Sequence, residues 1–178
     1  MFFKSKVSAE QKAEMVASYL PSFPISNANK LANLANFSGV PEGDFELLLE
    51  LFSFYMHFAN RMAFRELGAE PCNRFSYRLI VTVANRVAVS LNKDFSSVQF
   101  IAELKDKYNQ REDYYANFRK FAPDPGEPQR NTLFWEFAHV IFNGFMNSRD
   151  TADLVMVVNI LAPEVAEFSE ETNKVLKT

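Results

Sequence analysis

The sequence predicts an all-α fold, a compact bundle of about seven or eight helices, on three observations. Apolar residues recur at steps of three and four along several segments, which is the spacing of one helix face. The chain has 19 Phe but only 5 Gly, a composition that disfavours a fold rich in loops and β-turns. No Asn-Gly or Asp-Gly pair stands between alternating apolar runs, the pattern that marks a β-hairpin.

Capping signals and periodicity place the helices along the chain. Ser8 and Gln11 have the spacing of a capping box, and Asp150 can cap the start of a later helix. Gly68 suits the end of a helix, and Pro163 suits a first turn, where no backbone N–H is needed. The expected helices span residues 8–20, 27–37, 41–67, 73–92, 97–121, 130–147, 151–161 and 163–176.

The expected helix 41–67 is apolar over most of its circumference. Two apolar stripes leave only a narrow polar line between them, formed by Glu46, Glu50, Ser53, His57, Asn60 and Arg61. The expected helix 130–147 is similar, with a polar line of Thr132, Glu136, His139, Asn143 and Asn147. Such a helix is buried on two sides, so it lies at the centre of a bundle or forms an interface. We expect both polar lines to face solvent or a polar groove.

The length fits one domain, residues 1–178. The clearest break is the proline-rich stretch 122–130, APDPGEPQR. Only about fifty residues follow it, so we interpret it as an exposed connection within the domain rather than as a linker between domains.

The charge and the cysteine content restrict the partners and the cellular location that can be expected. The formal net charge is −3, which disfavours nucleic acid as the main partner, because phosphates require a cationic surface. No apolar run is long enough to cross a bilayer, and Lys4 and Lys6 interrupt the amino terminus where a signal peptide needs an apolar core. The single cysteine, Cys72, cannot form an internal disulfide. We expect a cytoplasmic protein without membrane insertion.

A metal site is one candidate for chemistry. Glu136 and His139 are three residues apart, so both project from one helix face, as in the di-iron carboxylate bundles. A metal-binding, oxidoreductase-like enzyme would need His57 and Glu50 as well, brought in by folding. His57 and Glu50 are seven residues apart, roughly 10 Å along a helix, which is too far for both to bind one ion. We expect no metal to bind there.

A concentration of arginines is the second candidate. Arg61 and Arg65 are one turn apart, as are Arg74 and Arg78, and their planar guanidinium groups suit carboxylates and phosphates. If the two helices form a hairpin, the four would gather at its closed end as a site for a small anion. We favour the alternative that they pair with the protein's own acids, of which residues 124–171 supply nine.

Cys72 could be a reactive thiol, because a helix amino terminus and nearby arginines lower a thiol pKa. A lone cysteine without a neighbouring histidine is more often inert packing, so we assign no catalytic residue and no cofactor. The sequence favours a non-catalytic accessory or protein-interaction module. Because two expected helices are apolar on two sides, we expect it to form a homodimer through one of them.

Overall fold

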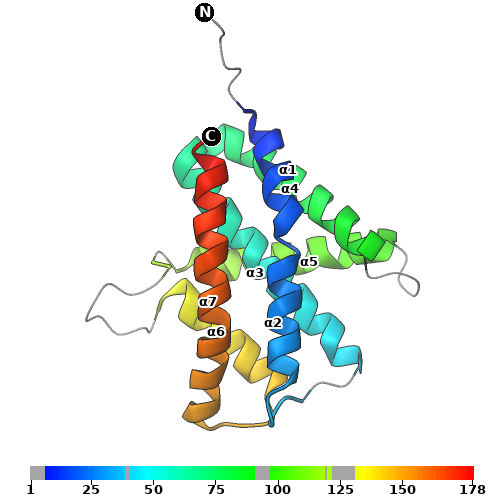
Figure 1. Cartoon of the computed structure of the whole chain (residues 1–178), viewed down its shortest axis with the longest axis vertical. Helices are drawn as coiled ribbons and strands as arrows, with labels where there is room; N and C mark the ends of the chain where they lie inside the picture. The colour runs from blue at the N-terminus through cyan, green and yellow to red at the C-terminus, as the bar shows by residue number, and fades with distance from the viewer. Residues whose placement is uncertain (1–6, 39–40, 91–96, 119, 122–130) are drawn as a thin grey trace, which may run out of the picture.

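Seven helices make up most of the part of the chain that the structure describes. The computed structural model describes residues 7–38, 41–90, 97–118, 120–121 and 131–178. Within these ranges there is no strand, only an isolated antiparallel bridge between Phe37 and Met146, so the all-α prediction is confirmed (Figure 1). The helices are α1 (Ala9–Tyr19), α2 (Ser22–Ala32), α3 (Pro41–Leu67), α4 (Ala69–Ser90), α5 (Ser97–Ala116), α6 (Leu133–Phe145) and α7 (Thr151–Leu176).

Side-chain caps fix the starts of three helices. The Ser8 hydroxyl accepts from the Gln11 amide at 3.2 Å and the Gln11 side chain accepts from the Ser8 amide at 2.9 Å, so the predicted capping box is present. Asp150 caps α7 as predicted, accepting from the Ala152 amide at 2.9 Å. Thr132 caps α6 by accepting from the Trp135 amide at 3.3 Å, a cap that the sequence reading missed.

Two helices begin earlier than expected. Helix α2 begins at Ser22 rather than 27, and α4 begins at Ala69 rather than 73. Each carries a proline, Pro24 and Pro71, in its first turn, where the missing N–H leaves no helical bond unmade. Gly68 separates α3 from α4 with a φ of +82°, a left-handed conformation that glycine adopts without strain.

The expectation of separate helices at 151–161 and 163–176 is wrong. Helix α7 is continuous from Thr151 to Leu176 and contains Pro163. A proline inside a helix removes one backbone hydrogen bond and costs about 3 kcal/mol. Burial of Leu161, Val165 and Phe168 on both sides of the proline offsets this cost.

Helix α3 is the centre of the molecule. It contacts α2, α4, α5, α6 and α7. Every side chain from residue 49 to residue 59 is buried. Stacked rings join α3 to its neighbours: the ring centroids of Phe54 and Phe137 are 3.7 Å apart, and those of Phe58 and Phe121 are 4.0 Å apart. The burial includes Glu50, Ser53 and His57. The expectation that this polar line faces solvent or a polar groove is therefore wrong for these three residues, whereas Glu46 at the start of the line is exposed.

This burial also removes the premise on which self-association was expected. Five helices of the same chain cover most apolar side chains of α3, and Phe64 near its end is left 59% exposed. Helix α6 packs on α3 and α7, with Phe137, Ala138 and Ile141 fully buried. The buried stripes of these two helices are therefore not available to a second copy.

The outer helices surround this centre. In Figure 1, α1 and α2 lie end to end beside α7, and both contact it. Helix α1 also packs along α4. The proline-rich connection 122–130 lies outside the described residues, but the chain before and after it is joined, because the Leu133 and Phe134 amides donate to the carbonyls of Lys120 and Phe121 at 2.9 and 3.0 Å.

Candidate functional site

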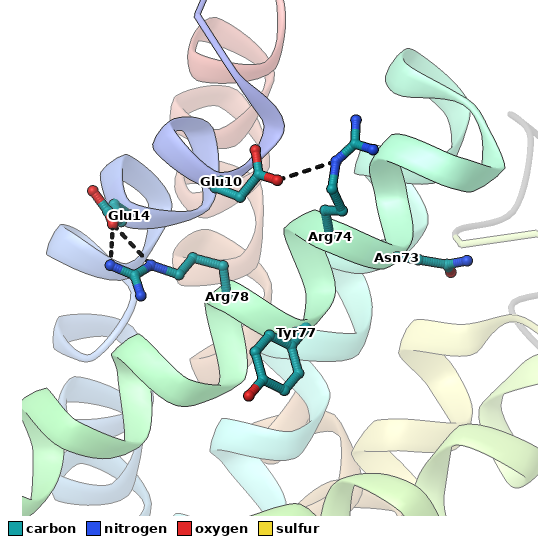
Figure 2. Close-up of a pocket in the computed structure, with 6 residues that line it drawn as sticks. All are labelled: Glu10, Glu14, Asn73, Arg74, Tyr77 and Arg78. Carbon is teal, nitrogen blue, oxygen red and sulfur yellow. Dashed lines mark hydrogen bonds and ion pairs between the residues drawn. The ribbon is translucent and has the colours of Figure 1, made fainter.

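Two of the predicted arginines bridge α4 to α1. Arg74 Nε lies 3.1 Å from Glu10 Oε1, and a second nitrogen of Arg74 binds Glu70. Arg78 Nε donates to Glu14 Oε1 at 2.8 Å, and its Nη2 donates to the same oxygen. Figure 2 shows the Arg74–Glu10 and Arg78–Glu14 pairs as two rungs between the helices.

The other two arginines point elsewhere. Arg61 donates to the Phe118 carbonyl at the end of α5. Arg65 binds Glu66 at 3.0 Å and Asn173 of α7 at 3.2 Å. The four arginines do not share one anion site. Three of them pair with the protein's own carboxylates, but these come from α1, α3 and α4 rather than from residues 124–171.

The paired arginines border a shallow depression of about 600 Å³. It is lined by Glu10, Glu14, Asn73, Arg74, Tyr77 and Arg78. A neighbouring depression of about 550 Å³ is lined by Val7, Gln11, Glu14, Met15 and Ser18. Glu14 lines both depressions, and the surface that carries the two is called here the α1–α4 face.

Tyr77 is the functional candidate that the sequence reading missed. Its aromatic side chain is 69% exposed. It lies three residues after Arg74 and directly before Arg78 (Figure 2). The signal was present in the helix pattern, since Phe75, Leu79 and Val83 form the buried side of α4 and Tyr77 lies off that stripe.

Glu136 and His139 line a groove between α5 and α6. The groove has a volume of about 470 Å³ and is lined by Arg111, Tyr114, Glu136, His139, Val140, Asn143 and Gly144, and we call it the α5–α6 groove. The Tyr114 hydroxyl donates to Glu136 Oε2 at 3.2 Å. The His139 ring lies edge-on to Trp135, with the centroids 5.0 Å apart.

His57 and Glu50 belong to different surroundings. His57 is 5% exposed, and its ring centroid lies 5.2 Å from that of Tyr115. Neither ring nitrogen has a hydrogen-bond partner among the described residues. Burial, and then the charge of Arg61, lowers its pKa to about 4, so the ring is neutral.

Glu50 is bound by two cations of α5. Arg111 Nε donates to it at 2.8 Å and Lys107 Nζ at 3.2 Å. Among the described residues, no three His, Cys, Asp or Glu side chains are grouped so that they could hold a metal ion. Glu136 and His139 thus share a groove, while Glu50 is engaged in ion pairs and His57 lies in the core.

Cys72 is not set up as a nucleophile. The side chain is buried, and its thiol lies 3.0 Å from Asn60 Oδ1. Burial raises the thiol pKa, the opposite of the shift that a helix amino terminus was expected to give. The hydrogen bond to Asn60 makes Cys72 part of the contact between α3 and α4.

Comparison of the chain with protein-family models, curated proteins and solved structures finds no match. In the described part of the chain, no helix combines the length and the apolar character needed to cross a membrane. What the molecule does must therefore be inferred from its own surfaces.

Proposed function

We propose that the protein is a non-catalytic interaction protein, and that its α1–α4 face binds a second copy of the same chain. The observation that carries this proposal is the exposure of Tyr77 between two arginines in a shallow depression. Tyrosine and arginine are the residue types that most often supply the binding energy of an interface, and they do so near its centre. An exposed phenol also becomes buried at little conformational cost.

The charges of this face are self-complementary. Glu10 and Glu14 form an acidic row on α1, and Arg74 and Arg78 form a basic row on α4. Because Glu10 pairs with Arg74 and Glu14 with Arg78, the acidic row and the basic row run in the same direction along their helices. A two-fold axis lying between the helices and along them would place each acidic row against the basic row of the other copy. Complementary rows favour this register over others.

The existing ion pairs leave capacity for a partner. Arg78 uses Nε and Nη2 on Glu14, and both bonds go to one carboxylate oxygen. A guanidinium group has five N–H donors and a carboxylate about four acceptor sites, so each group can bind across an interface without losing its present partner.

The size of the face is compatible with weak association. A stable interface buries about 1,000 Å² or more in total. The depression around Tyr77 alone is small, but the face continues through Glu14 to Met15, whose side chain is 42% exposed. We expect a dimer that dissociates on dilution below micromolar concentration.

Sedimentation equilibrium at micromolar concentration tests the proposal. The expected mass is that of two chains, and Tyr77→Ala should weaken association at least about tenfold, because it removes a central aromatic contact. Val155→Ala on α7, which truncates a side chain 47% exposed at another site, is the matched control and should leave the mass unchanged. A wild-type mass of one chain at tens of micromolar would rule the proposal out.

A further inference from the structure

The α5–α6 groove contains a carboxylate whose charge is not balanced nearby. The hydrogen-bond partner of Glu136 is the Tyr114 hydroxyl, a neutral group, and no described cation forms an ion pair with Glu136. Arg111 also lines the groove, but its Nε and Nη2 both donate to Glu50. Lys107 binds Glu50 and Glu46. These two cations and two carboxylates balance each other, which leaves Glu136 as the net negative charge.

Further acceptors follow Glu136 on the same side of α6. His139 and Asn143 come three and seven residues later, and both line the groove. Neither side chain makes a hydrogen bond to a described residue, and the His139 ring packs edge-on against the Trp135 ring. The carboxylate of Glu136 and an imidazole nitrogen of His139, one turn apart on one helix face, can both accept hydrogen bonds from one ammonium group.

The remaining lining suits a short alkyl chain. Val140 supplies an apolar wall, and Gly144 has open space where a side chain would lie. The Tyr114 ring lies at the opposite side, on α5. Burial and the Glu136 carboxylate raise the Tyr114 pKa, so its hydroxyl remains a donor to Glu136, and its ring face can attract a cation.

We propose that the α5–α6 groove binds a small organic cation, the primary ammonium group of a short aliphatic amine, with Glu136 as the counter-ion. The ammonium donates to Glu136 and His139, which are one turn apart, and its alkyl chain lies against Val140 toward Asn143. This site is separate from the α1–α4 face and goes beyond the proposed function, so either proposal can fail without the other.

The single tryptophan provides the readout. Trp135 is the only tryptophan in the chain, and its ring lies 5.0 Å from the ring of His139, which lines the groove. The protein is titrated with butylamine at neutral pH while the Trp135 emission is followed. EDTA is present so that trace metal on Glu136 and His139 does not contribute. Butan-1-ol and butyrate have the same alkyl chain with a neutral and an anionic head. We expect a saturating response to butylamine alone, with a Kd on the order of 1 mM.

The variants separate the counter-ion from general charge effects. Glu136→Gln keeps the shape of the side chain and removes its charge, and it should weaken binding at least about tenfold. Glu167→Gln on α7 removes one negative charge away from the groove and should leave the Kd unchanged.

Three results would overturn the site. An equal response to butan-1-ol would mean that only the alkyl chain is recognised. An unchanged Kd in Glu136→Gln would mean that Glu136 is not the counter-ion. The side-chain amide of Asn143, followed by NMR, reports binding that leaves Trp135 emission unchanged. If neither signal responds to butylamine at ten times the expected Kd, the groove does not bind an ammonium group.

Discussion

An imidazole buried without a hydrogen-bond partner is stable only while it is neutral. His57 is in this position on α3, beside the ring of Tyr115 and near the positive charge of Arg61. Its pKa is about 4 in the folded protein and about 6.5 in the unfolded chain. Between these values the unfolded chain takes up a proton that the folded protein does not.

Stability should therefore decrease as the pH falls from about 6.5 to about 4, with a loss of about 3 kcal/mol in the free energy of unfolding from His57 alone. Urea unfolding at a series of pH values measures this loss. His57→Phe keeps an aromatic ring in the core and removes the proton, so it should flatten the pH dependence in this window.

His139 is the matched control, because it is the only other histidine and lies in the α5–α6 groove rather than in the core. His139→Gln should leave the pH dependence as it is in the wild type. An equally steep loss of stability in His57→Phe would mean that other groups cause it.

At the scale of the elements, local signals predicted helix existence better than helix ends. The capping box at Ser8 and the cap at Asp150 were readable because a cap depends on residues only two or three positions apart. The start of α4 and the continuity of α7 were not, because a proline tolerates more than one position. Whether Pro163 begins a helix or lies inside one is decided by the packing of Leu161, Val165 and Phe168.

Pro163 gives a prediction at this scale. Its side chain is exposed and it lies in the interior of α7, so Pro163→Ala removes no core contact and restores one backbone hydrogen bond. We expect the free energy of unfolding to increase by about 1–3 kcal/mol. Thermal and urea unfolding measure the change.

The reverse substitution on the same helix serves as the control. Ala166 is also exposed, and Ala166→Pro should destabilise the protein by about 3 kcal/mol. If Pro163→Ala instead lowers stability, the local geometry of α7 around Pro163 matters more to packing than the lost hydrogen bond.

At the scale of the whole molecule, the sequence predicted the residues of both candidate sites only in part. Arg74 and Arg78 were noticed because they are one turn apart, but Glu14, the partner of Arg78, lies 64 residues away and no local pattern connects them. Glu136 and His139 were noticed for the same local reason. The groove that contains them needs Tyr114 and Arg111 from α5, which only the fold brings there.

The central polar line of α3 shows the limit of sequence reasoning most clearly. A narrow polar line on an apolar helix indicates either a solvent-facing edge or a buried ion-pair contact. Here the cations of α5, Lys107 and Arg111, cover Glu50, so the middle of the line is buried. The correct interpretation required the identity of the neighbouring helix, and the apolar surface expected to form a dimer was covered in the same way.

The central claim, that two copies meet through the α1–α4 face, is tested most directly by reversing charges in separate chains. In one chain Glu14→Arg leaves two cations at this rung, and in another Arg78→Glu leaves two anions. Each chain repels itself, both within one molecule and across the proposed two-fold interface. In a mixture, each cationic rung faces an anionic rung of the other chain.

Sedimentation equilibrium distinguishes self-repulsion from pairing between the two chains. The two charge-reversed chains are measured alone and mixed in equal amounts at micromolar concentration. We predict the mass of one chain, 20.4 kDa, for each alone, and about twice that mass for the mixture. Restored pairing in the mixture can arise only between molecules, because the pair within each chain stays broken. A mixture that keeps the mass of one chain would contradict the account.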